Sequence, residues 1–124
     1  MIRGSQQAAG VSPIRADAGS EPGVLIWGSQ IFEDSVVLRV SGELDIVGAE
    51  DLRAVLEVQR SRGHDVMLDL AKVEFIDSAG ISVLLEALRE FTLADLSLRL
   101  FRSLRPQVRR LLTVTGANEL LQSV

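Results

Sequence analysis

One serine stands where a side-chain hydroxyl could do chemistry. Ser78 belongs to the small polar segment Asp77-Ser78-Ala79-Gly80, which separates an apolar run ending at Ile76 from an apolar-periodic stretch beginning at Ile81. The first run predicts a buried strand and the second an amphipathic helix, so the hydroxyl would lie at a helix N-terminus. It could serve there as a helix cap, as a catalytic nucleophile or as an acceptor of a phosphoryl group.

The helix cap is the simplest use of Ser78. Removing a cap costs about 1 kcal/mol, whereas each large apolar side chain that the helix buries contributes about 1.5–3 kcal/mol before entropy. The predicted helix carries five such side chains on one face: Ile81, Leu84, Leu85, Leu88 and Phe91. The helix would therefore form without the Ser78 hydroxyl, and Asp77 could cap it instead. The hydroxyl is dispensable to the fold.

A hydrolase nucleophile fits the sequence poorly. The nucleophile elbow requires Gly-x-Ser-x-Gly, but Ile76 stands where its first glycine should be. The only histidine, His64, precedes the strand that leads to Ser78 and should lie at the opposite end of the sheet. We therefore expect a protein without enzymatic activity.

A phosphoryl acceptor is compatible with the position of Ser78. The free backbone N–H groups and the dipole of a helix N-terminus favour an anion, and the small neighbours Ala79 and Gly80 would let another protein approach closely. A phosphate adds about two negative charges. Placed beside Asp77 and near Asp45, these charges would change which partner surface fits this part of the molecule.

Composition excludes several classes of function. The chain has 124 residues, no cysteine, one histidine and a net charge of −4. Disulfides, thiolate metal sites and multi-histidine metal sites are therefore excluded within one chain, and we expect no cofactor. A negative net charge argues against nucleic acid as the main partner. No apolar run approaches the roughly 20 residues of a membrane span, and the N-terminus lacks the apolar core of a secretory signal. We expect a soluble, cytoplasmic protein.

Two charged clusters are interpreted as solvated faces. The acidic cluster comprises Glu43, Asp45, Glu50 and Asp51, and the basic cluster comprises Arg99, Arg102, Arg105, Arg109 and Arg110. Acidic side chains at a helix start also complement its dipole, each by about 0.3–1 kcal/mol.

The chain divides into a flexible N-terminal tail over residues 1–22, rich in Gly, Ser and Ala, and a single domain over residues 23–124. Apolar patterning predicts strands over Val24–Phe32, Val36–Val40, Val66–Ile76 and Leu96–Leu100, and a short edge strand over Glu119–Val124. It predicts helices over Val47–Arg62 and Ala79–Phe91, and a third from Pro106 to Gly116. Trp27 is interpreted as a packing residue, and the strand over Val66–Ile76 is expected to be buried on both faces.

The order β-β-α-β-α-β-α-(β) predicts an α/β fold with a mixed sheet of about four to five strands. Strand–helix–strand crossovers are right-handed and connect parallel strands, so the central strands should be parallel. Parallel strands end at one common edge. The loops at Glu43–Asp45 and Asp77–Gly80 should therefore meet there, although they are more than thirty residues apart in the sequence.

Three segments carry a family resemblance. Gly42-Glu43-Leu44-Asp45, Phe75-Ile76-Asp77-Ser78-Ala79-Gly80-Ile81 and Pro106-Gln107-Val108-Arg109-Arg110-Leu111-Leu112, followed by Thr115-Gly116, resemble the STAS domain of bacterial anti-sigma-factor antagonists in order and spacing. The resemblance covers about residues 24–124. It implies a compact α/β domain in which helices pack against a mixed sheet.

The resemblance also implies partner switching. In that family the unphosphorylated antagonist binds a cognate anti-sigma factor, itself a serine kinase of the GHKL type, and so releases the sigma factor. The kinase phosphorylates the serine after the aspartate, which corresponds to Ser78, and a phosphatase reverses this. Asp45 would lie close to the phosphorylated loop, and Asp45, Asp77, Ala79, Gly80 and Ser82 are the expected partner-binding residues.

An alternative function stays open. The position after the serine is often Ser or Thr in these antagonists and is Ala79 here, and an Asp-Ser-Ala-Gly version also occurs in STAS accessory subunits of lipid-transport ABC complexes, without a phosphorylation switch. The family usually continues into a C-terminal helix, whereas this sequence ends at Val124. We expect that helix to be absent, which would expose apolar surface and favour a homodimer.

Overall fold

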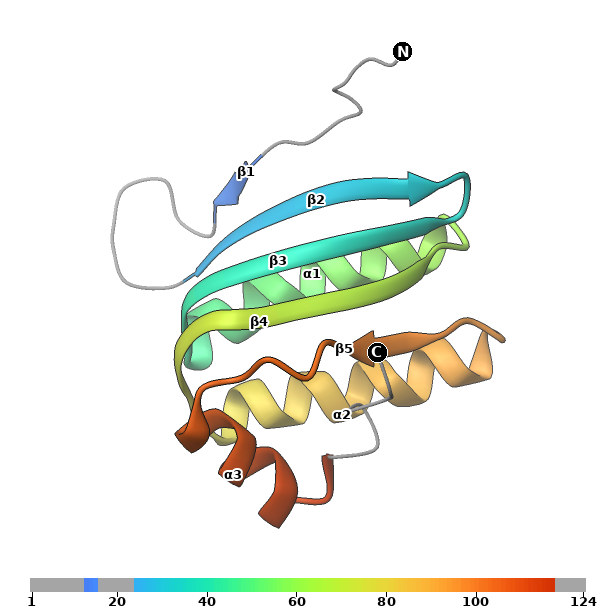
Figure 1. Ribbon diagram of the computed structural model, residues 1–124. Coiled ribbons are helices and arrows are strands. Elements are labelled where there is room, and N and C mark those ends of the chain that lie inside the picture. Colours follow the sequence, from blue (N-terminus) through green and yellow to red (C-terminus); the bar gives the residue numbers. More distant parts are fainter. Residues whose placement is uncertain (1–12, 16–23, 118–124) are drawn as a thin grey trace.

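A mixed sheet carries the fold, with its described strands in the order β1-β2-β3-β4-β5 (Figure 1). The computed structural model describes residues 13–15 and 24–117. The strands are β1 (Pro13–Arg15), β2 (Val24–Phe32), β3 (Ser35–Leu44), β4 (Asp65–Ile76) and β5 (Leu98–Leu100), and the helices are α1 (Ile46–Ser61), α2 (Ser78–Leu93) and α3 (Pro106–Val114). Strands β1, β2 and β3 pair antiparallel, and β3, β4 and β5 pair parallel. The predicted α/β fold with parallel central strands is confirmed.

The core lies between one face of the sheet and the two long helices. Figure 1 shows α1 and α2 on the same side of the sheet. The fully buried side chains include Ile26, Leu38, Leu68 and Leu100 from four strands, Leu52 and Leu56 from α1, and Leu84 and Phe91 from α2. Each such side chain contributes about 1.5–3 kcal/mol when it is buried, so this layer holds both helix starts in place.

An exposed row of ion pairs follows the seam between α1 and α2. Arg53 Nη1 lies 2.6 Å from Glu86 Oε1, and Arg60 Nε lies 3.8 Å from Glu90 Oε1. The hydrogen bond and the charge of Glu86 raise the pKa of the Arg53 guanidinium above its ordinary value. Surface pairs of this kind add little stability, and the apolar layer beneath them does most to fix the two helices.

Strand β4 is buried on one face only, so the expectation of burial on both faces is wrong. Its inward side chains are Val66, Leu68, Leu70, Val73 and Ile76, and the side chains between them are exposed or half-buried. Two register shifts against β3, after Arg39 and after Gly42, mark bulges in which β4 carries the extra residue. Each bulge restarts the inward–outward alternation. Lys72 and Phe75 thereby reach the outer face, which α1 and α2 leave uncovered.

Strand β3 continues four residues beyond its predicted end at Val40 and reaches Leu44. Gly42 allows this because it adopts a φ of +108° at the second bulge, a conformation that glycine reaches without strain. The extension carries Gly42-Glu43-Leu44 into the sheet. Asp45 therefore stands directly at the strand end rather than within a loop.

The N-terminal tail contains regular structure that its composition did not predict. Residues Pro13–Arg15 form β1, which pairs antiparallel with Leu25, Ile26 and Trp27 of β2. The N–H and C=O groups along the edge of β2 would otherwise lack strand partners, which favours such pairing. The rest of the predicted tail, the domain boundary at residue 22 and the predicted strand Glu119–Val124 lie outside the described residues, so these remain predictions.

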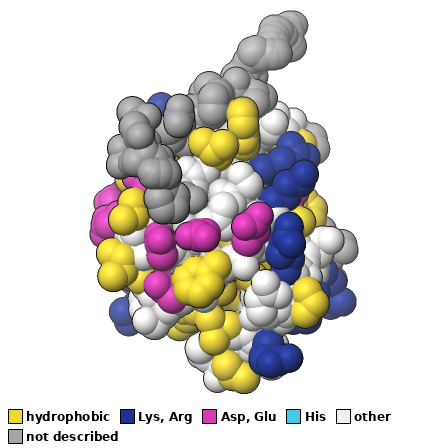
Figure 2. All heavy atoms as spheres, turned by 90° about the vertical axis from the view of Figure 1, so that its left-hand side faces the viewer, with side chains coloured by type: hydrophobic (Ala, Val, Ile, Leu, Met, Phe, Trp, Pro, Cys, Tyr) yellow, Lys and Arg dark blue, Asp and Glu magenta, His cyan; other side chains and the backbone are white. Residues whose placement is uncertain are grey.

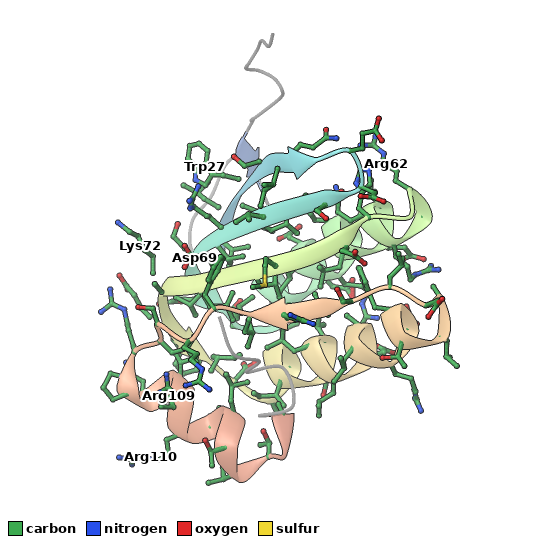
Figure 3. All side chains as sticks on the ribbon, turned by 45° about the vertical axis from the view of Figure 1, so that its right-hand side comes forward. Trp27, Arg62, Asp69, Lys72, Arg109 and Arg110 are labelled. Carbon is green, nitrogen blue, oxygen red and sulfur yellow. The ribbon has the colours of Figure 1, made fainter. Side chains whose placement is uncertain are left out.

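Trp27, which the sequence predicts to be a packing residue, lies outside the core. Its side chain is 38% exposed, on the face of β2 opposite the buried Ile26. Figure 3 shows it on the outer face of the sheet, on the same side of the molecule as Lys72. A shallow hollow on that face is lined by Trp27, Arg39, Asp69 and Lys72, among others.

Helix α3 begins at Pro106 as predicted, and the chain turns at Gly116, whose φ is +82°. Gln107 Nε2 donates a hydrogen bond of 3.1 Å to the carbonyl oxygen of Glu74, which fastens the first turn of α3 to the end of β4. Within the part of the chain that the structure describes, no helix has the length and apolar character needed to cross a membrane.

Candidate functional site

Asp77, and not Ser78, caps helix α2. One carboxylate oxygen of Asp77 accepts hydrogen bonds from the backbone N–H groups of Ala79 at 2.9 Å and Gly80 at 3.2 Å. Ser78 is the first residue of the helix and is exposed. Its hydroxyl forms no hydrogen bond to the described residues. The suggestion that Asp77 could replace Ser78 as the cap is confirmed, and the hydroxyl is free for another role.

Asp45 has the same role at helix α1. Its side chain accepts a hydrogen bond of 3.0 Å from the backbone N–H of Gly48. The Asp45 and Asp77 side chains are both half-buried. Each therefore sits at the end of a parallel strand and fixes the first turn of the following helix. The caps follow β3 and β4, which are neighbours in the sheet.

Strand β3 ends at Leu44 and strand β4 ends at Ile76, and we term this end of the sheet the carboxyl edge. The two strand ends are joined there by a backbone hydrogen bond. The backbone N–H of Asp77 donates to the carbonyl oxygen of Leu44 at 3.3 Å. Gly80 packs so closely that a Cβ atom there would lie 2.6 Å from the same oxygen. The prediction that these two loops meet at one edge is confirmed.

The exposed part of the carboxyl edge combines hydroxyl and apolar groups. Ser82 lies one turn after Ser78 on α2 and is also exposed, so both hydroxyls lie on one side of the helix. Three large apolar side chains of this edge are exposed, namely Ile46 at 71%, Val47 at 51% and Phe75 at 47%. Apolar groups at the surface beside polar ones are typical of an interaction site.

Sequence reasoning missed these apolar residues. Apolar patterning in the sequence starts the first helix at Val47, leaves Ile46 outside any predicted element, and places Phe75 in a strand expected to be buried on both faces. The sequence carries no signal for their exposure, because apolar side chains at a strand end or a helix start resemble those that enter the core.

Charge is unevenly distributed over this edge. Figure 2 shows Asp and Glu side chains in a row across the middle, hydrophobic side chains among them, and Lys and Arg side chains gathered toward the right of the view. An edge with separated acidic and basic zones favours a partner whose own charges are arranged to match.

The remaining candidate residues are less accessible. Ala79 is partly buried and packs against the core, and Gly80 is buried. Their small size lets α2 approach Leu44 and leaves Ser78 raised above its neighbours. The assignment of Asp45, Asp77, Ala79, Gly80 and Ser82 as partner contacts stays a prediction.

A serine–histidine pair within one chain is excluded by the topology. His64 precedes β4 and Ser78 follows it, and this strand has 12 residues, a separation of roughly 40 Å at about 3.3 Å per residue. The His64 ring instead contacts Gln59 Oε1 at 2.8 Å. Among the described residues, no group of His, Asp and Glu side chains is placed to hold a metal ion.

Comparisons with known proteins agree with this fold. The STAS domain family model matches residues 29–123. An anti-sigma-B factor antagonist of Staphylococcus epidermidis is 31% identical over 90 residues, covering 72% of this chain and 82% of the relative. The anti-sigma-B factor antagonist of Listeria monocytogenes is 30% identical over 90 residues, covering 72% of this chain and 78% of the relative.

Solved structures show the same architecture. The anti-sigma factor antagonist SpoIIAA in its unphosphorylated form superposes with a TM-score of 0.67 at 22% identity, covering 80% of this chain and 87% of the other. SpoIIAA from Bacillus in the phosphorylated form gives a TM-score of 0.64 at 22% identity, covering 80% of this chain and 90% of the other. At this identity the likeness concerns the fold alone. With the family match and the sequence relatives, it establishes that the chain belongs to the STAS domain family.

Proposed function

We propose that this protein antagonises an anti-sigma factor. In its unphosphorylated form it would bind the anti-sigma factor through the carboxyl edge and thereby release a sigma factor. The single observation that carries this proposal is the exposed Ser78 hydroxyl, which capping does not use, beside exposed apolar side chains. The names of the sequence relatives support the same class of function.

We further propose that the partner is a serine kinase of the GHKL type that phosphorylates Ser78, and that a phosphatase restores the binding form. The accessible position of Ser78 supports this, since a kinase must bring its active site to the hydroxyl. The buried Gly80 and the partly buried Ala79 on its C-terminal side leave that approach open.

Phosphorylation would act through charge. A phosphate adds about −1.5 to −2 charges at neutral pH, here next to the carboxylate of Asp77. The Ala79 and Gly80 N–H groups already donate to Asp77, so they are not free to receive the phosphate. The new charge would therefore stay on the surface that meets the partner, where it would oppose apolar contact and repel acidic groups.

Replacement of Ser78 tests the switch, with Ser82→Ala as a matched control because Ser82 is also exposed and lies one turn away on the same helix. After treatment with the cognate kinase, mass spectrometry should find phosphate on wild type and on Ser82→Ala but none on Ser78→Ala. Unphosphorylated Ser78→Ala should still bind the anti-sigma factor. Phosphorylated wild type should bind at least tenfold more weakly, a difference of about 1.4 kcal/mol. Phosphate at another residue with Ser78 unmodified would refute the proposal.

The stability of the phosphorylated protein separates two mechanisms. The dipole of α2 offsets part of the added charge by about 0.3–1 kcal/mol, so the melting temperature should shift by less than about 5 °C. A much larger drop would mean that phosphorylation acts by unfolding the edge and not by changing its charge.

A second function is an accessory role in a lipid-transport ABC complex without phosphorylation. The observation that favours it is Ala79, which presents no second hydroxyl beside Ser78. Purification from native cells would distinguish the two functions. Recovery of a transporter ATPase without a serine kinase would favour the accessory subunit.

A further inference from the structure

One segment near the C-terminus carries positive charge that acidic residues of the same segment do not balance. Residues 96–118 contain five arginines and neither aspartate nor glutamate, although the whole chain has a net charge of −4. These arginines belong to β5, to helix α3 and to the segment that joins them. The fold therefore gathers positive charge in one region.

Packing turns the arginines of α3 outward. Val108 and Leu112 are fully buried, and the hydrogen bond from Gln107 to Glu74 holds the helix against β4. Arg105, Arg109 and Arg110 are left exposed. The guanidinium of Arg109 donates to the carbonyl oxygen of Arg102, which ties the preceding segment to the helix.

Strand β4 extends this region with one more cation. The first bulge of β4 pairs Lys72 with Ser41 and so turns its side chain to the outer face of the sheet. Figure 3 shows Lys72, Arg109 and Arg110 along one side of the molecule. We name the basic surface as Lys72, Arg102, Arg105, Arg109 and Arg110.

The cations of the basic surface are not neutralised within the described part of the chain. Elsewhere in the same molecule, Arg39 pairs with Asp69, Arg53 with Glu50 and Glu86, and Arg60 with Glu57 and Glu90. None of the five residues of the basic surface forms an ion pair with a carboxylate in residues 13–15 or 24–117. As far as the described residues go, their charges remain available to another molecule.

We propose that the basic surface binds a short acidic segment of a partner protein, a stretch with several Asp or Glu side chains. The surrounding charges favour this class over extended polyanions. Glu74 lies at the border of the basic surface, and Asp and Glu side chains occupy the neighbouring part of the edge (Figure 2). A nucleic acid duplex or a flat anionic membrane would meet both zones and be repelled by one. A short segment can stay within the basic zone.

The experiment uses the full chain and a fluorescent peptide of twelve glutamates, with binding followed by anisotropy at low salt. Arg109→Glu/Arg110→Glu should lower the affinity at least tenfold. Arg62→Glu/Arg89→Glu is the matched control, because both residues are exposed, lie outside the basic surface and change the net charge equally. The control should lower the affinity less than threefold. For wild type, raising the salt concentration sixfold should weaken binding strongly, as expected for exposed charges.

Lys72→Glu keeps the test valid if the helix variant fails to fold, since Lys72 is on a different element and should also weaken binding at least threefold. The inference is wrong if wild type does not bind the peptide, or if both double variants lose the same affinity. A third outcome would also refute it: wild type binds a DNA duplex or anionic phospholipid vesicles more tightly than the peptide, and Arg109→Glu/Arg110→Glu abolishes that binding. Ser78 has no part in this test, so its outcome is independent of the proposed switch.

Discussion

At the scale of single residues, Asp77 and Ser78 divide two tasks between neighbouring positions. The carboxylate of Asp77 satisfies two backbone N–H groups that the helix leaves free, and the serine hydroxyl satisfies none of the described ones. Removing the Asp77 cap would cost about 0.5–2 kcal/mol. Ser78 can therefore be modified or replaced without loss of the cap, as the proposed phosphorylation switch requires.

Gly80 sets the distance between helix α2 and the end of β3, and its replacement is the prediction at this scale. In Gly80→Ala the new Cβ would lie 2.6 Å from the Leu44 carbonyl oxygen and 2.7 Å from Ile76 Cγ1. Such overpacking typically costs about 1–3 kcal/mol, and the better helix propensity of alanine returns about 1 kcal/mol. Because the nearer contact is with a backbone oxygen, the overpacking cost should be about 2–3 kcal/mol. We therefore expect a net loss of about 1–2 kcal/mol in the free energy of unfolding, measured with urea.

Ser82→Ala is the control for this prediction, because its side chain is exposed two residues further along the same helix. It should change the free energy of unfolding by less than about 0.5 kcal/mol. Equal stability of Gly80→Ala and wild type would show that the close approach of α2 to Leu44 does not constrain the edge.

At the scale of elements, the two bulges of β4 decide which side chains reach the outer face. Lys72 and Phe75 are turned outward because β4 carries one extra residue at each bulge relative to β3. Asp69 supports the first bulge by accepting a hydrogen bond of 3.0 Å from the Ala71 N–H. The outer face of the sheet, which carries the proposed contacts of Lys72, thus depends on irregular pairing in a strand whose inner face is regular.

Deletion of Ala71 tests this account. Removing one residue from a strand ordinarily transfers all following side chains to the other face. Ala71 is the extra residue between the pairs Arg39–Asp69 and Ser41–Lys72, so its deletion should leave Leu70 and Val73 inward. We expect a folded protein that loses about 1–2 kcal/mol in the free energy of unfolding, a typical cost of a single change, as measured by circular dichroism in urea.

Deletion of Met67 is the matched control in the same strand. It would move either Val66 or Leu68 out of the core and should cost about 2–5 kcal/mol, as does the loss of a buried aliphatic side chain. If both deletions destabilise the protein equally, the interpretation of Ala71 as a removable bulge residue is wrong.

Periodicity in the sequence predicts most elements and fails at the bulges. Helix α1 was expected over Val47–Arg62 and spans Ile46–Ser61, because its buried positions repeat with helical spacing. Pro106 and Gly116 mark the limits of α3 through their own backbone preferences. The outward turn of Phe75 was not predictable, because an extra strand residue leaves no mark in an apolar run.

The candidate site was predictable in position but not in detail. Strand order alone placed Asp45 and Asp77 at one edge, since parallel strands end together. Which of two adjacent capping residues takes the N–H groups depends on local geometry, and both Asp77 and Ser78 are good caps. The exposure of Ile46 could not be derived, because its apolar side chain resembles those that enter the core.

At the scale of the whole molecule, the lateral side of the sheet formed by strand β2 is only partly covered by another strand. Strand β1 pairs with three residues of the nine-residue β2, and the exposed side chains of that strand include Leu25, Trp27 and Ile31. Exposed sheet edges are templates for pairing with another chain. We therefore expect the N-terminal strand to reduce self-association through this side of the sheet.

Deletion of residues 1–15, which removes β1, tests this role against deletion of residues 1–12, which retains it. The shorter chain without β1 should show a larger apparent mass at equal concentration in size-exclusion chromatography with light scattering. The chain that keeps Pro13–Arg15 should behave as wild type. Identical masses for both truncations would argue against a protective role of β1.

The backbone hydrogen bond between Leu44 and Asp77 affects how fast a partner would bind and dissociate. The start of α2, which contains Ser78, is held to the end of β3, from which α1 follows. The hydrogen bond between Asp77 and Leu44 and the close packing at Gly80 make this connection. A partner would therefore meet a surface that needs no ordering before contact, which avoids an entropic cost of association. Differences in affinity between the two chemical states of Ser78 would then appear mainly in the lifetime of the complex, as is usual for variants of one interface.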